Sequence, residues 1–228
     1  MFEQSYLAAS FMILWRYHAA FLSGLRQTLA LALITWGAGL GAGSLLGYAG
    51  ARCEGSIGAL SRWCSFILSG VPVLVFLFWL HYPLQSLLGI VIDPFFTSAF
   101  AFSVINVFAV SDLVRAQVRD FPQQYLLAAK VCGLSPGQTM LRIELPIILR
   151  QILPGLLMLQ VSMLHMTLFA SLISVDEVFR TAQHINADCY KPVEIYTALG
   201  IFFLCASLPL NALALWLKKK FSRSLSER

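Results

Sequence analysis

Five polar residues stand inside two of the most apolar segments of this 228-residue chain. They are Asn106 in one segment and Gln160, Ser162, His165 and Thr167 in the other. A polar side chain in an apolar helix is costly in lipid, so such groups often line a cavity, and these five form a candidate path for a solute. For His165, the one ionisable group deep in its segment, two interpretations stay open. It is a neutral imidazole bonded to a neighbouring helix, or it contacts a solute carboxylate or amine.

Catalytic chemistry is not indicated elsewhere in the sequence. The chain contains no H-E-x-x-H motif, no G-x-S-x-G motif and no carboxylate pair with a clear partner. The loop 175–191 holds a group of ionisable residues whose spacing is too unspecific for a metal site: Asp176, Glu177, Arg180, His184 and Asp188. This loop is interpreted either as a docking surface for a soluble protein or as a solvated loop. We therefore predict no enzyme activity, no metal and no cofactor bound by this chain.

The candidate residues must be positioned by membrane-spanning helices, because the composition is that of a membrane protein. Hydrophobic residues make up 58% of the chain and charged residues only 12%, whereas soluble domains have about 25% charged residues. The apolar segments are continuous and lack the alternation of a membrane β-barrel. We predict a single all-α polytopic domain over 1–228, with about five spans at 20–50, 57–82, 95–117, 147–174 and 193–217.

The distribution of basic residues predicts the orientation, because Lys and Arg are concentrated in cytoplasmic loops. Most of the 16 Lys and Arg residues fall in the 51–62 connection, in the 115–150 region or in the tail 218–228. These parts are predicted to be cytoplasmic, so the N-terminus is outside and the C-terminus inside. Residues 1–18 are expected to lie at the membrane interface as an amphipathic segment anchored by aromatic residues.

Region 118–146, between the third and fourth spans, carries the signals of a structured hairpin. Gly133 suits the position just after the end of a short helix. Ser135 with Gln138 predicts a capping box at the start of a second helix. The Leu145-Pro146 pair predicts a departure from α geometry, because proline disfavours that geometry in the residue before it. By spacing alone, the hairpin either docks on a partner or merely joins two spans.

Other patterns predict how the spans pack. A four-residue spacing places three glycines of the first span on one helix face, where another helix can come close. These are Gly39, Gly43 and Gly47. Pro72 predicts a kink in the second span. Asp112 and Arg115 lie three apart in the third span, so a local ion pair is expected.

The run Ala128-Ala129, Gly133 and Leu145-Pro146 resembles the motif by which permease subunits of bacterial ABC importers bind their ATPase. That motif is Glu-Ala-Ala, a glycine four residues after the last alanine, and a downstream Leu-Pro. The wider sequence, from about 24 to 221, resembles permeases of the polar amino acid uptake family. The ATPase-coupling surface that this resemblance implies comprises Leu127, Ala128, Ala129, Gly133, Leu134, Ser135, Leu145 and Pro146.

The resemblance implies a type I ABC importer-like fold in a bacterial inner membrane, with region 118–146 as a cytoplasmic coupling hairpin. The chain is then expected to be the membrane subunit of an ATP-driven importer for a polar amino acid or a related small zwitterion. Its expected partners are an ATP-binding cassette ATPase that uses the ATP, a second and paralogous permease subunit, and an extracytoplasmic solute-binding protein. Membrane lipid surrounds the chain, and no nucleic acid partner is expected.

Departures from the family pattern concern the substrate. The glutamate of the motif is Leu127, and the family's frequent Lys-Asp-Thr-Ser is 165–168, His-Met-Thr-Leu, in this chain. The missing charges predict that a paralogous partner supplies much of the solute pocket. The alternative function is a secondary transporter or channel driven by an ion gradient. Such proteins often contain inverted repeats, and the sequence shows no internal repeat.

Overall fold

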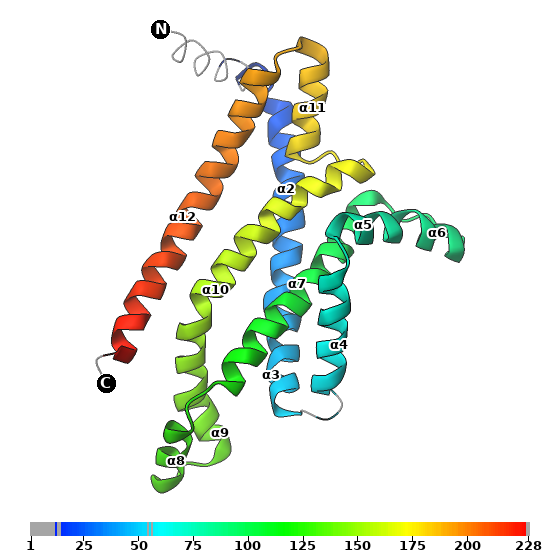
Figure 1. Cartoon of the computed structure of the whole chain (residues 1–228). Helices are drawn as coiled ribbons and strands as arrows, with labels where there is room; N and C mark the ends of the chain where they lie inside the picture. Colours follow the sequence, from blue (N-terminus) through cyan, green and yellow to red (C-terminus); the bar gives the residue numbers. More distant parts are fainter. Residues whose placement is uncertain (1–11, 13–14, 54, 56, 227–228) are drawn as a thin grey trace.

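The computed structural model describes residues 12, 15–53, 55 and 57–226, and these residues form helices and connections without a strand (Figure 1). Four continuous helical segments among them are long and apolar enough to cross a membrane, namely His18–Arg52, Pro94–Arg119, Pro136–Ile173 and Pro192–Phe221. They correspond to four of the five predicted spans, so the all-α membrane architecture is confirmed. Of the predicted interfacial segment 1–18, residues 1–11, 13 and 14 lie outside the described part.

Several of these segments are composite. The first joins α2 (His18–Ala38), the π-helical turn η1 (Gly39–Gly43) and α3 (Ser44–Arg52). The next long helix is α7 (Pro94–Arg119), followed by the short α8 (Gln123–Val131). The third segment joins α9 (Pro136–Thr139), the π-helical turn η2 (Met140–Glu144), α10 (Leu145–Met166) and the 3₁₀-helix η3 (Thr167–Ile173). The chain then forms α11 (Val178–Cys189) and α12 (Pro192–Ser226).

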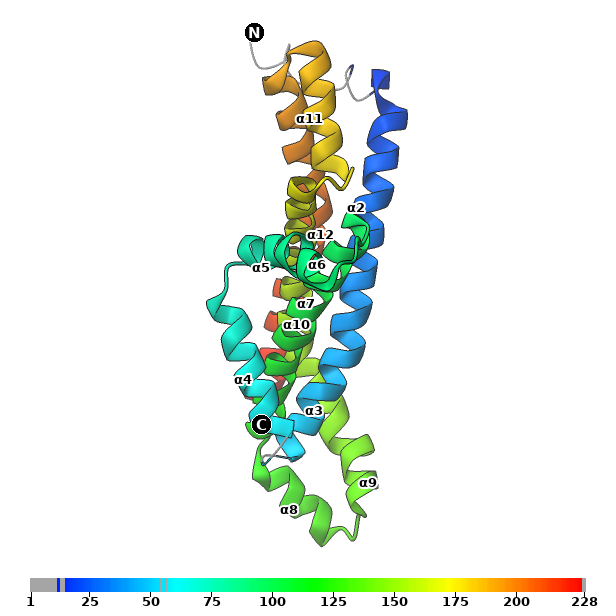
Figure 2. The same ribbon diagram turned by 90° about the vertical axis from the view of Figure 1, so that its right-hand side faces the viewer.

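The predicted second span, 57–82, is a bent pair and not one straight helix. α4 (Ile57–Gly70) meets the segment of α5 (Val73–His81) and α6 (Pro83–Leu88) at 97°. Pro72 lies between them with extended backbone (φ −56°, ψ 135°), and it has no N–H to continue the helix. The predicted kink is therefore confirmed, although α5 and α6 run across the long helices (Figures 1 and 2). The described chain has four spans, or five if this pair counts as one.

The glycine face of the first span packs on α7, as predicted. A Cβ added to Gly43 would lie 2.7 Å from the carbonyl oxygen of Val107, and one added to Gly47 would lie 2.6 Å from that of Ser111. The same test at Gly39 meets the side chain of Asn106. Small residues thus let the two backbones approach closely, which is how helices gain packing contacts where lipid offers no hydrophobic drive.

The hairpin forms at the end of the bundle where α3 ends (Figure 2). Gly133 has φ +70°, and the N–H groups of Gly133 and Leu134 donate to the carbonyls of Lys130 and Ala129 at 3.0 Å each. These two bonds make a Schellman motif. The predicted capping box of Ser135 is also present. Gly133 and the cap together close the turn between α8 and α9.

One prediction for the hairpin is wrong. Leu145 has α geometry (φ −57°, ψ −48°), and the helix continues through Pro146 into α10. The π-helical turn η2 immediately precedes the pair. A π-turn inserts one residue into the helix, and this relieves the clash between a proline ring and the carbonyl four residues earlier. The second helix of the hairpin is therefore continuous with the fourth predicted span.

Candidate functional site

Two of the predicted path residues meet at the centre of the bundle. Asn106 of α7 donates through Nδ2 to the carbonyl of Thr35 on α2 at 2.8 Å and to Gln160 Oε1 on α10 at 2.9 Å. Trp36 Nε1 donates to the carbonyl of Gln160 at 2.9 Å. Asn106 is fully buried, and Gly39 leaves the room that its side chain occupies. The cluster joins α2, α7 and α10 inside the subunit.

The other three predicted path residues lie further along α10 and in η3. Thr167 is fully buried, and its hydroxyl donates to the carbonyl of Leu164 at 2.7 Å. Ser162 and His165 are exposed on the surface of the chain. The imidazole of His165 lies edge-on to Phe203 of α12, with 5.9 Å between the ring centroids. Of the five predicted residues, these two are therefore the ones a solute or a second subunit could reach.

The predicted coupling residues lie on both faces of the hairpin. Of the eight, Ala129 is buried, and Leu134 and Pro146 are half-buried. The other five are exposed, namely Leu127, Ala128, Gly133, Ser135 and Leu145. A cavity of about 510 Å³ lies between the hairpin and the end of α3. Leu127 and Lys130 of α8 and Arg52 of α3 line it. The hairpin thus offers a surface of mostly small or apolar side chains that another protein could contact closely.

The ion pair predicted between Asp112 and Arg115 is present. Both residues also bond to α4, because Ser65 donates to Asp112 Oδ1 at 2.9 Å and Arg115 donates to Ser61 Oγ at 3.1 Å. The pair was expected to be local on α7. It instead holds α4, the first half of the bent span, through Ser61 and Ser65. Nothing in the sequence indicates that these two serines take part.

The loop 175–191 is largely the helix α11, which packs on α2 and α12 (Figure 1). Glu177 is fully buried at its start and accepts hydrogen bonds from the N–H groups of Phe179 at 2.9 Å and Arg180 at 2.8 Å. The interpretation as a solvated loop is therefore wrong for Glu177, although Asp176 and His184 are exposed. Among the described residues, no group of three potential ligands could hold a metal ion.

Burial raises the pKa of the Glu177 carboxyl from 4.5 to about 7, against the effect of its hydrogen bonds. Folding then favours the protonated acid, so its contribution is complete below pH 4.5 and is lost as the pH rises through 7. The shift corresponds to roughly 3 kcal/mol in full, of which about 2 kcal/mol is lost between pH 5.5 and pH 8. We therefore expect the detergent-purified protein to melt several degrees lower at pH 8 than at pH 5.5. Thermal unfolding measured across this range tests the prediction.

Glu177→Gln should flatten this pH dependence, because a neutral amide fills the same space. Asp188→Asn is the matched control, since Asp188 is an exposed carboxylate of the same helix. A Glu177→Gln protein whose melting temperature still falls like that of the wild type would contradict the assignment.

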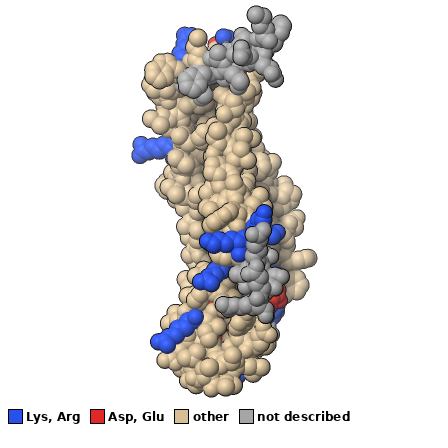
Figure 3. Space-filling model, turned by 90° about the vertical axis from the view of Figure 1, so that its left-hand side faces the viewer, with Lys and Arg blue, Asp and Glu red and all other residues tan. Residues whose placement is uncertain are grey.

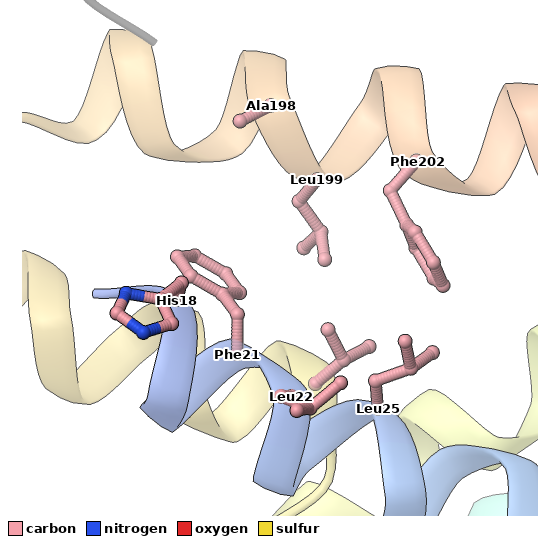
Figure 4. A pocket seen from close by; sticks show the side chains of 8 residues that line it. His18, Phe21, Leu22, Leu25, Ala198, Leu199 and Phe202 are labelled. Carbon is pink, nitrogen blue, oxygen red and sulfur yellow. The ribbon is translucent and has the colours of Figure 1, made fainter. Parts of the chain in front are cut away.

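A second cavity, of about 230 Å³, lies at the other end of the bundle between α2, α11 and α12 (Figure 4). Its lining is apolar apart from His18, which stands at the start of α2; Phe21 and Leu25 of α2 and Leu199 and Phe202 of α12 point into it. The His18 imidazole is bonded to the carbonyl of Trp15 at 2.8 Å, and the other side chains that line the cavity are apolar. We therefore do not include it in the candidate path.

Comparisons with known proteins agree with this arrangement. The family described as "Binding-protein-dependent transport system inner membrane component" matches residues 39–227. The octopine transport system permease protein OccM of Rhizobium radiobacter is 27% identical over 226 residues, 92% of this chain and 91% of that protein. The glutamine transport system permease protein GlnP of Escherichia coli K12 is 28% identical over 202 residues, 87% and 91% of the two chains. A crystal structure of an amino acid ABC transporter has the same fold, with a TM-score of 0.81 at 21% identity over 92% of this chain and 98% of that one.

Proposed function

Because this chain belongs to the family of inner membrane components of binding-protein-dependent transport systems, we propose that it is the permease subunit of an ATP-driven importer for a polar amino acid or a related small zwitterion. Full-length similarity to permeases named for octopine and glutamine transport supports this class of solute. The observation that carries the proposal is the hairpin, whose Schellman turn and capping box hold the predicted coupling residues in one defined shape.

The proposed partners follow from the chemistry that this chain lacks. Its sequence has no phosphate-binding glycine loop, so ATP is bound and hydrolysed by an ATP-binding cassette subunit that docks on the hairpin. A second permease subunit, paralogous to this one, completes the path. A soluble binding protein delivers the solute at the opposite end, where Asp176, just before α11, and His184 of α11 are exposed. Closure of the ATPases pushes on the hairpin and switches the path between two orientations.

The proposed orientation places the hairpin and C-terminus in the cytoplasm and the N-terminus outside. In the structure the start of α2 and α11 lie at one end, with the hairpin at the other (Figure 1). Most of the basic side chains visible on the face in Figure 3 lie in its lower half, towards the hairpin end. This distribution supports the orientation, because basic residues are retained on the cytoplasmic side.

For the path, we propose that Ser162 and His165 face the solute and that Asn106, Gln160 and Thr167 hold the helices behind them. Removing a hydrogen bond to a charged group loses roughly 1.5–3 kcal/mol. His165→Ala should therefore weaken uptake about tenfold or more, or change solute preference. The measurement is uptake by the reconstituted complex over a range of solute concentrations.

The control for this substitution is Phe203→Leu, which removes the ring against His165 but leaves the imidazole. If both variants lower uptake equally, His165 acts through packing and not through the solute. Unchanged uptake and preference in His165→Ala would remove it from the path altogether.

The proposed function is tested by purifying the chain with its associated proteins and reconstituting the assembly in vesicles. Uptake is expected to require ATP and the soluble binding protein, and to persist when ion gradients are collapsed. Uptake that follows an ion gradient without ATP would instead favour the secondary transporter. Ligand screening of the co-purified binding protein then identifies the solute.

A further inference from the structure

The hairpin is tied to the first span by an ion pair whose carboxylate is buried and whose guanidinium is about half exposed. Arg52, the last residue of α3, donates to the carboxylate of Glu144 in the π-helical turn η2, across 92 positions of sequence. Glu144 is only 5% exposed. The guanidinium of Arg52 also lies over the ring of Tyr48, at 5.4 Å from its centroid. Arg52 is thus held from two sides, while Glu144 lies between α3 and the hairpin, at the edge of the cavity between them.

A buried carboxylate requires a partner, because leaving it unpaired in a medium of low dielectric constant is strongly unfavourable. Withdrawing Arg52 while Glu144 stays buried would incur that penalty. The ion pair therefore keeps the two elements together when either of them moves. Neither Arg52 nor Glu144 is part of the coupling motif that the sequence resembles.

At its other end, the same first span is tied to the outer helix α11. The hydroxyl of Thr28 on α2 accepts a hydrogen bond from the N–H of Val178, the first residue of α11, at 3.1 Å. Gly24 lies one turn earlier, and a Cβ there would collide with Thr181 of α11. Thr28 is fully buried. The continuous segment 18–52 thus has one specific contact at the hairpin and another at α11.

We propose that the first span is a rod that carries movement of the coupling hairpin to the outer helix α11, with Arg52 and Glu144 as positioning residues at one end and Thr28 at the other. This rests on the proposed function, in which the hairpin is moved by the ATPase. The covalent connections of the hairpin lead only into α7 and α10. The ion pair adds a direct link from the hairpin to α3, beside the packing of the first span on α7. Movement of α2 then displaces the end of the chain where a binding protein docks.

The experiment compares Glu144→Gln, Thr28→Val and their combination in the complete reconstituted complex. Both substitutions keep the size of the side chain. Glu144→Gln removes the charge that pairs with Arg52, and Thr28→Val removes the hydroxyl that accepts from Val178. We expect each to lower the amount of solute moved per ATP hydrolysed at least about fivefold, the lower range of measured coupling between distant sites. The double variant should move as much solute per ATP as the poorer single variant. Once one end contact of the first span is lost, losing the other has no further effect, so the two losses are not additive.

Two controls separate this proposal from a general loss of stability. Gln117→Ala removes the 2.8 Å bond to Gln151 between α7 and α10, in the same half of the molecule, and should leave the ratio unchanged. Arg52→Lys keeps the charge and should retain most of the coupling. Additive losses in the double variant, or a normal ratio in both single variants, would overturn the rod. If the wild-type complex shows no ATP-driven uptake, the proposed function fails instead.

Discussion

Replacing Gly133 by valine should abolish most ATP-driven uptake while leaving the chain in the membrane. Gly133 has φ +70°, and a β-branched residue held in that region costs roughly 1–3 kcal/mol. No atom lies within 4 Å of a Cβ built there, so the whole penalty comes from the backbone. The chain can escape it only by opening the Schellman turn that links Ala129 to Leu134. Uptake and co-purification of the ATPase measure the effect, and both are expected to fall about tenfold.

Two further substitutions distinguish the turn from its sequence neighbourhood. Gly133→Asn should retain most uptake, because asparagine tolerates positive φ. Gly89→Val introduces the same strain at φ +64° after α6, also in open space, and should lower stability without separating ATP hydrolysis from transport. Normal assembly and uptake in Gly133→Val would mean that the shape of this turn is not what the ATPase recognises.

Gly43→Val should prevent the first span from packing on α7. Its Cβ would lie 2.7 Å from the carbonyl oxygen of Val107 and 2.9 Å from the side chain of Val110, and backbone cannot yield as a flexible side chain can. Overpacking a core typically costs about 1–3 kcal/mol. Here the first span would have to move away from α7 along most of their shared contact. We expect a sharp drop in the amount of folded protein, measured by size-exclusion chromatography and thermal unfolding.

Gly41→Val is the matched control for this prediction. Gly41 belongs to the same π-helical turn, but nothing lies within 4 Å of a Cβ at that position. The control should fold like the wild type. If both variants are equally destabilised, helix propensity and not close packing explains the loss.

The sequence predicted those features that depend on local geometry. Gly133 and the Ser135 cap follow from backbone rules that act over a few residues. The glycine face and the break at Pro72 were also predicted, since both are set by residue type and spacing. The backbone geometry predicted for Leu145 is wrong because the π-helical turn before it accommodates Pro146 within the helix. No residue type in the sequence indicates a π-helical turn.

Contacts between distant segments were beyond sequence reasoning. Asn106 and Gln160 were recognised as candidates, but not that they bond to one another inside the subunit. The pairing of Arg52 with Glu144 depends on the three-dimensional meeting of α3 and η2. The sequence places Glu177 in a loop, whereas its side chain caps α11; an acidic residue at the start of a helical pattern is a signal that reveals such a helix.

The amide cluster at Asn106 limits how this protein can deform. Pulling α2 away from α7 or α10 would strand a primary amide and an indole N–H in hydrocarbon, where each unsatisfied group costs several kcal/mol. These three helices are therefore expected to turn together as one block. Opening and closing must then occur at the seams around that block, by sliding against α12, the bent pair or a neighbouring subunit.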